Sequence, residues 1–205
     1  MSRHLVTRRA ILCAVTVISL LAGRQAKAQP PRSSTPLERV IAAARAETQV
    51  TRYYDPSYVK LSYPGGDPPP DRGVCSDVIV RAFRAGGIDL QREVHEDMAR
   101  HFAAYPHIWG LRAPDPNIDH RRVANLMVFF TRKDKAVSIT DRPEDYQPGD
   151  VIAWDLGGGL LHMGLVVDER ASPNGPHFLV HNIGAGARLE DVLFDWRIIG
   201  HYRYF

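Results

Sequence analysis

Cys75 is the side chain with the most distinctive chemistry in this sequence. The other cysteine, Cys13, lies in an N-terminal segment that has the layout of a secretory signal and would be removed with it. An exported protein with one remaining thiol cannot use it for an internal disulfide. We therefore interpret Cys75 as a nucleophile, which requires deprotonation of the thiol and a base near it.

Two of the histidines occur where such a base could be held in place. His162 begins a short apolar run directly after Gly157-Gly158-Gly159, and His181 lies in the next apolar run. If the two runs pair as a β-hairpin, the imidazoles can lie side by side. A thiol, an imidazole base and a polar side chain that orients the base are the parts of a cysteine hydrolase.

The thiol is expected at the beginning of a helix. Residues 62–73 are rich in proline and glycine and predict a loop without regular structure. The apolar spacing then predicts a helix over residues 75–85, which Gly86-Gly87 ends. Free N–H groups at the start of a helix favour a thiolate and can stabilise an oxyanion.

Other helices are expected before residue 132, and strands after residue 150. Thr35-Pro36-Leu37-Glu38 has the pattern of a capping box and begins the first helix. Two more helices are predicted over residues 94–104 and 121–131. Antiparallel strands are predicted over residues 151–154, 160–167, 177–183 and 198–204. Helices followed by strands indicate an α+β domain, with N-terminal helices packed on a C-terminal antiparallel sheet.

The N-terminus predicts export. Residues 1–28 form the expected signal peptide, with three arginines before an apolar run over residues 10–23 and a cleavage site after Ala28. That run is shorter than the ~20 residues that a membrane-spanning helix needs, so we expect no stable membrane anchor. Arg8-Arg9 leaves both the general secretory and the twin-arginine route open. The expected location is the periplasm or the outside of the cell.

The remaining chain is expected to be a short linker, residues 29–34, and a single domain, residues 35–205, that acts as a monomer. The 205 residues carry a net charge of +3, but five basic residues and no acidic one lie in the signal peptide. The mature chain is therefore slightly acidic, which excludes nucleic acid as a partner on electrostatic grounds. His162, His177 and His181 could be brought together by two strands, but Cys75 would be the only thiolate and no C-x-x-C pair occurs, so we predict neither a metal nor another cofactor.

Several motifs resemble known bacterial proteins. Four segments, in this order, resemble the NlpC/p60 and CHAP superfamily of papain-like cell-wall hydrolases: Gly73-Val74-Cys75-Ser76-Asp77, Gln147-Pro148-Gly149-Asp150-Val151, Leu161-His162-Met163-Gly164-Leu165-Val166 and Phe178-Leu179-Val180-His181. A longer set, from Tyr54 to His201-Tyr202, resembles the bacterial domain-of-unknown-function family 1287, which has no assigned activity.

The resemblance implies roles for three residues. Cys75 would be the nucleophile, His162 the base and His181 the third residue that orients the imidazole, with Asn182 as the alternative third residue. One position departs from the superfamily pattern, because Val74 stands where an aspartate usually precedes the cysteine.

Further polar side chains are candidates for substrate binding. Arg72 could pair with a peptide carboxylate, although a contact within its own loop would also explain it. The dense run Asp119-His120-Arg121-Arg122 suggests binding, although Asp119 would also serve as a helix cap. The candidate substrate-binding residues are Arg72, Tyr54, Asp77, His120 and Arg122.

These observations predict an exported cysteine hydrolase. Its substrate would be the stem peptide of cell-wall peptidoglycan. It would act through a thioacyl intermediate on Cys75, either as an endopeptidase on a bond between stem-peptide residues or as an amidase on the sugar-to-peptide amide. The substrate is implied by the resemblance and by the signal peptide. Two alternatives are a thiol acyltransferase and a wall-binding module that has the same fold without turnover.

Overall fold

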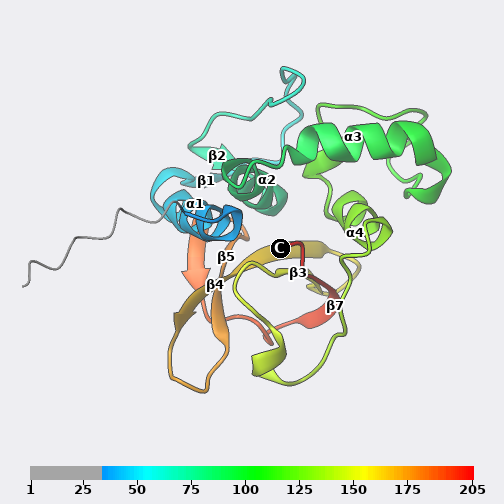
Figure 1. Cartoon of the computed structure of the whole chain (residues 1–205). Coiled ribbons are helices and arrows are strands. Elements are labelled where there is room, and N and C mark those ends of the chain that lie inside the picture. The colour runs from blue at the N-terminus through cyan, green and yellow to red at the C-terminus, as the bar shows by residue number, and fades with distance from the viewer. Residues whose placement is uncertain (1–33) are drawn as a thin grey trace, which may run out of the picture. The chain divides into compact units, whose positions relative to one another are not determined.

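The computed structural model describes residues 34–205 (Figure 1). The predicted signal peptide, residues 1–28, and all but the last residue of the predicted linker lie outside the described residues. Within residues 34–205, none of the helices combines the length and the apolar character needed to cross a membrane.

The first two helices begin where the sequence predicts. Helix α1 (Pro36–Val50) has the expected capping box, in which Thr35 Oγ1 accepts from the Glu38 N–H at 3.1 Å and Glu38 Oε2 accepts from the Thr35 N–H at 2.7 Å. Helix α2 (Cys75–Ala85) has the predicted bounds, so Cys75 is its first residue.

The other helices begin at different positions from those predicted. Helix α3 (Leu90–His101) starts four residues early, because the Asp89 side chain caps it by accepting from the Gln91 N–H. Helix α4 (Val123–Arg132) starts two residues late, because the preceding residues form the 3₁₀ turn η2 (Asp119–Arg121). Two further 3₁₀ turns are η1 (Phe102–Ala104) and η3 (Pro143–Asp145).

The C-terminal part is a five-stranded antiparallel sheet with the order β6-β5-β4-β3-β7. Its strands are β3 (Val151–Asp155), β4 (Leu161–Arg170), β5 (His177–Asn182), β6 (Ala187–Glu190) and β7 (Arg197–Tyr202). The predicted α+β class, with helices packed on an antiparallel sheet, is confirmed (Figure 1). Strand β6 was not predicted from the sequence.

A short parallel pairing joins the segment before the Pro-rich loop to the last two residues of that loop. Strands β1 (Tyr53–Tyr54) and β2 (Arg72–Gly73) pair directly before α2. The prediction that residues 62–73 contain no regular element is therefore wrong for the last two, because the three prolines end at Pro70 and leave the following N–H groups free to pair. This pairing fixes the approach of the chain to Cys75.

The two faces of the sheet belong to different parts of the core. Helices α1, α2 and α4 cover one face, where Met163 and Val180 join the larger cluster of buried apolar side chains (Figure 1). Trp154 and Leu179 belong to a smaller cluster on the other face. Side chains alternate along a strand, so His162, the neighbour of Met163, lies on the Trp154 side, where its ring stacks on the indole at 5.6 Å.

Candidate active site

Cys75 is buried at the start of α2, with 4% of its surface exposed. Burial disfavours the charged thiolate and raises the pKa of Cys75 to about 12. The backbone N–H groups of Met163, Ser76 and Cys75 itself oppose this shift. The prediction that the helix start favours the thiolate accounts only for the N–H groups, whose effect on the pKa is weaker than that of burial. The lowered thiol pKa that it implied is therefore wrong. In this conformation the thiol is protonated at neutral pH.

A chain of hydrogen bonds leads from His162 across the sheet. His162 Nε2 lies 2.8 Å from His181 Nδ1, and His181 Nε2 lies 2.8 Å from Glu190 Oε2. The three side chains come from neighbouring strands, β4, β5 and β6. The two imidazoles thus lie side by side, as the hairpin prediction expected, and Glu190 is a further member that the sequence analysis missed.

The order of these bonds determines where the protons lie. A carboxylate is an acceptor only, so Glu190 requires the proton of His181 on Nε2, which leaves Nδ1 of that ring as an acceptor. His162 must then donate from Nε2, and its Nδ1 carries a free lone pair. Glu190 therefore fixes the tautomer in which His162 Nδ1 can accept a proton.

Both histidines are neutral at ordinary pH. Burial, with a smaller contribution from the neighbouring His181, lowers the pKa of His162 to about 3. Burial also lowers the pKa of His181, against the attraction of Glu190. The Cys75 thiol is not hydrogen-bonded to either ring, but it lies close to the backbone of Met163, the residue after His162. Catalytic hydrogen bonds are often long in a free enzyme and shorten when substrate binds.

Aromatic rings enclose the histidine pair. Trp154 stacks on His162, and Trp196 makes edge contacts with both imidazoles. Gly164 makes this packing possible, because a Cβ there would lie 3.0 Å from the Trp154 ring and 3.3 Å from His181 Cβ. The glycine of the His-Met-Gly motif is therefore explained by close packing beneath the histidine pair.

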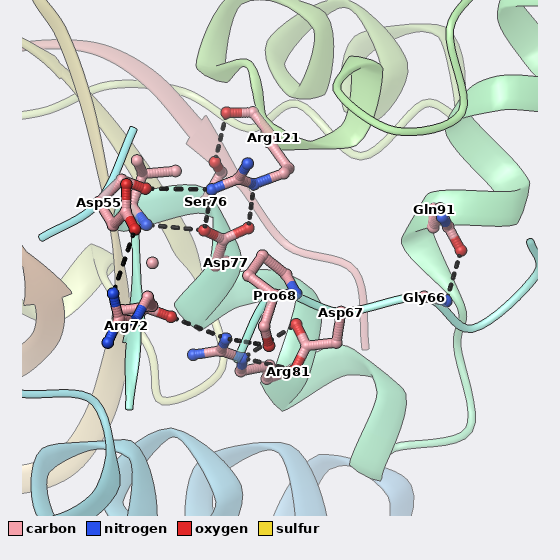
Figure 2. Close-up of polar contacts among 12 residues, drawn as sticks. Asp55, Gly66, Asp67, Pro68, Arg72, Ser76, Asp77, Arg81, Gln91 and Arg121 are labelled. Carbon is pink, nitrogen blue, oxygen red and sulfur yellow. Dashed lines mark hydrogen bonds and ion pairs between the residues drawn. The ribbon is translucent and has the colours of Figure 1, made fainter. Parts of the chain in front are cut away.

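A buried ion pair holds the start of α2 (Figure 2). Arg121 binds Asp77 through Nε at 2.8 Å and Nη2 at 3.0 Å, and both side chains are only 1% exposed. Asp77 Oδ2 also accepts from the Val74 N–H, and Ser76 Oγ donates to the Arg121 carbonyl at 2.6 Å. Asp77 therefore positions the helix that carries Cys75.

The Pro-rich loop is tied to the other end of the same helix. Arg81 binds Asp67 and Glu47, and donates to backbone carbonyls of the loop, among them that of Arg72 (Figure 2). Asn182, the alternative third residue, donates to the Gly73 carbonyl at 2.9 Å and does not contact His162. It fastens the end of β5 to the strand that precedes the nucleophile.

A cavity of about 430 Å³ lies beside the thiol. Of the residues predicted from the sequence, Cys75, Tyr54 and Arg122 line it. Among residues 34–205, the lining consists of Tyr54, Pro56, Val74, Cys75, Ile108, Trp109, Ile118, Arg121, Arg122, Val123, Ala124, Gly159, Leu160 and Leu161.

Three predicted substrate-binding residues do not line this cavity. Arg72 is half exposed and pairs with Asp71 and Asp55. Asp77 is buried with Arg121, and His120 is buried with a pKa that burial lowers to about 3. Over residues 34–205, no three histidine, cysteine or acidic side chains are grouped so that they could hold a metal ion.

Comparisons with known proteins identify the family of the chain. The uncharacterized protein YijF of Escherichia coli (strain K12) is 56% identical over 162 residues, which are 79% of this chain and 78% of YijF. A crystal structure from Staphylococcus aureus subsp. aureus Mu50, described as similar to a lipoprotein of the NLP/P60 family, has a TM-score of 0.41 and 16% identity over 82% of this chain. The chain spans only 41% of the length of that structure. Residues 41–204 match the family model described as "Domain of unknown function (DUF1287)". As predicted, the chain belongs to the DUF1287 family.

Proposed function

We propose that this protein is an exported cysteine hydrolase that cleaves an amide bond of cell-wall peptidoglycan. The observation that supports hydrolysis is a helix-start thiol that lies in a cavity and close to the backbone of Met163, the residue that follows His162; His162 is in turn oriented by His181 and Glu190. The substrate is inferred from the resemblance to wall hydrolases and from the predicted signal peptide.

The first half of the reaction forms a thioester. The Cys75 sulfur attacks the amide carbonyl while its proton passes to His162 Nδ1, and the carbonyl oxygen becomes an oxyanion. N–H groups at the start of α2 are available to stabilise that oxyanion. The C–N bond then breaks, the departing amine takes the proton from His162, and the acyl group remains on Cys75.

The second half releases the acid. Water attacks the thioester carbonyl and gives one proton to His162 Nδ1. The C–S bond breaks, the sulfur recovers that proton, and the product is a carboxylic acid. If an amine replaced water in this step, the same residues would catalyse acyl transfer.

The protonation states favour general-base catalysis over a preformed ion pair. A thiol with a pKa of about 12 and an imidazole with a pKa of about 3 are both uncharged at neutral pH. Proton transfer would therefore accompany the attack on the carbonyl, after substrate has brought the sulfur and Nδ1 together. The resting state resembles a serine–histidine pair more than a thiolate–imidazolium pair.

One observation favours a second function. In the described structure the buried thiol has no hydrogen bond to His162, which would also suit a wall-binding module without turnover. The two functions differ in whether covalent bonds of peptidoglycan are cleaved.

Mass spectrometry of purified peptidoglycan fragments tests the proposal. The mature protein is compared with the Cys75→Ala and His162→Ala variants, and with His101→Ala as a control that removes an exposed histidine. New fragments are expected only with the mature protein and the control, and their masses identify the cleaved bond. If folded protein binds the fragments and leaves every bond intact, the hydrolase proposal fails in favour of the wall-binding module.

A further inference from the structure

Two consecutive arginines line the cavity beside Cys75, and only one of them is neutralised within the fold. Arg121 donates to Asp77 and to the backbone carbonyls of Ser57 and Asp55. Arg122 forms no ion pair and no side-chain hydrogen bond with any residue in the range 34–205. Its Nη1 is buried without a hydrogen-bond partner in that range.

The Arg122 guanidinium packs against an aromatic ring and not against a carboxylate. The guanidinium carbon lies 4.2 Å from the centre of the Trp109 ring, a distance typical of a cation–π contact. Trp109 has a positive φ of 64°, a conformation that is uncommon for a residue with a side chain. Stacking on a ring leaves the edge of a guanidinium, with its N–H groups, available for a ligand.

Two acidic side chains, Asp115 and Asp119, interact electrostatically with Arg122 but do not pair with it. Asp115 accepts hydrogen bonds from Tyr58 and Asn117. Asp119 Oδ2 accepts from the Asp115 N–H, and Asp119 Oδ1 is buried without a hydrogen-bond partner in residues 34–205. Neither carboxylate is among the residues that line the cavity.

Arg122 is therefore the charged side chain of the described cavity lining that has no ion-pair partner. This lining contains no aspartate, glutamate or lysine, and Arg121 is compensated by Asp77. Arg122 is also the N-cap of α4, a helix with no acidic residue in its first turn and no side-chain cap, so the partial positive charge of that helix end has the same sign. One net charge suits a singly charged anion, and the planar guanidinium suits a carboxylate.

We propose that Arg122 binds a carboxylate of the substrate, next to the bond that reacts with Cys75. The inference rests on the proposed function only in treating the bound molecule as a substrate, and it adds that this substrate carries a free carboxylate. An amidated form of the same peptide would then be a poor substrate.

Binding of small probes tests this without any turnover. N-acetylglycine and N-acetylglycinamide have nearly the same size and differ in one negative charge. Each is titrated into the mature protein, and binding is followed by the fluorescence of Trp109, with Trp109→Phe as the blank for the other tryptophans. The variants Arg122→Gln and Arg122→Lys are compared with Arg112→Gln, which removes an exposed positive charge from a nearby position outside the cavity lining.

The expected result is that N-acetylglycine binds about tenfold or more tightly than the amide, because a hydrogen-bonded charge pair is lost with the amide. The preference should disappear in Arg122→Gln, decrease in Arg122→Lys and persist in Arg112→Gln. Equal binding of the two probes, absence of binding, or a preference that survives in Arg122→Gln would overturn the inference. Tighter binding of methyl phosphate than of N-acetylglycine would also overturn it.

A covalent measurement provides a second test at the same cavity. Iodoacetate and iodoacetamide alkylate a thiol by the same displacement of iodide, and only iodoacetate carries a carboxylate. The ratio of their rates at Cys75 should fall about tenfold in Arg122→Gln and stay unchanged in Arg112→Gln. If peptidoglycan stays intact but iodoacetate is preferred through Arg122, the hydrolase proposal is refuted and the carboxylate site is supported. If peptidoglycan is cleaved but Arg122 gives no preference for iodoacetate, the carboxylate site is refuted and the hydrolase proposal is supported.

Discussion

The Asp77→Asn substitution tests whether the buried ion pair holds the nucleophile helix. It removes the negative charge and keeps the shape of the side chain, so Arg121 is left as a buried cation without a counter-ion. The two side chains are each 1% exposed, and water therefore cannot replace the lost partner. The amide oxygen of asparagine can still accept from the Val74 N–H, but its NH2 group then faces the Arg121 Nε–H, so one hydrogen bond is lost together with the charge.

The expected loss of stability is large for one substitution. Removing one partner of a buried ion pair costs about 3–5 kcal/mol of unfolding free energy. For a domain of this size, each kcal/mol lowers the melting temperature by about 2–4 °C, so the variant should melt roughly 6–20 °C below the unsubstituted protein. Much of this cost reflects the unpaired charge of Arg121, and the net contribution of the pair is smaller.

Thermal unfolding followed by circular dichroism measures the effect, and urea unfolding gives the free energy. Arg197→Gln is the matched control, because it breaks the pair with Asp155 at a side chain that is 72% exposed. Such surface pairs contribute less than about 1 kcal/mol. Adding Arg121→Gln to Asp77→Asn removes the buried charge, so the double variant should lose less stability than the sum of the two single variants.

Two results would refute this reasoning. The first is an Asp77→Asn variant whose unfolding free energy falls no further than that of the surface control. The second is full additivity of the two single substitutions, which would mean that Asp77 and Arg121 act independently and that their contact does not position α2.

Three further results are expected. Glu190→Ala should slow peptidoglycan cleavage about tenfold to a hundredfold, which is less than the roughly 10²–10⁴-fold contribution of a general base. Glu190→Gln keeps an acceptor oxygen and should slow cleavage less. Equal cleavage rates for the unsubstituted protein and both variants would contradict a role for Glu190 in fixing the tautomers. Gly164→Ala should cost about 1–3 kcal/mol in urea unfolding and change the near-UV circular dichroism of Trp154, and an unchanged spectrum would show that the ring is not displaced. Burial lowers the folded-state pKa of His120 to about 3, below its usual 6.5. The contribution of the neutral ring to stability is therefore complete above pH 6.5 and is lost as the pH falls toward 3. In His120→Asn the unfolding free energy should fall less steeply over that range, and parallel curves for the two proteins would exclude His120 as the cause of the fall.

The sequence predicted the parts of the site that local patterns determine. The helix that begins at Cys75 follows from a breaker-rich segment before it and a Gly-Gly stop after it. The neighbouring positions of His162 and His181 follow from side-chain alternation in two adjacent strands. Each of these features depends on residues within one element or one hairpin.

Other parts depend on contacts that no local pattern contains. Glu190 lies on β6, a four-residue strand whose alternation is too short to distinguish from a loop, although the sequence Ala-Arg-Leu-Glu does alternate. The pairing of Asp77 with Arg121 joins residues 44 positions apart. The raised pKa of Cys75 results from packing by several elements at once, so a rule about helix termini predicts only one of its contributions.

The fold distributes stiffness unequally around the cavity. On one side, the nucleophile helix is held near its start by Arg121 and near its end by Arg81, both through several bonds to distant parts of the chain. On the other side, the cavity is bordered by the Gly157-Gly158-Gly159 turn, where all three residues have positive φ and no atom lies within 4 Å of an added Cβ. A large substrate that enters the cavity would therefore be accommodated by movement of the glycine turn, while the position of the Cys75 sulfur stays constant.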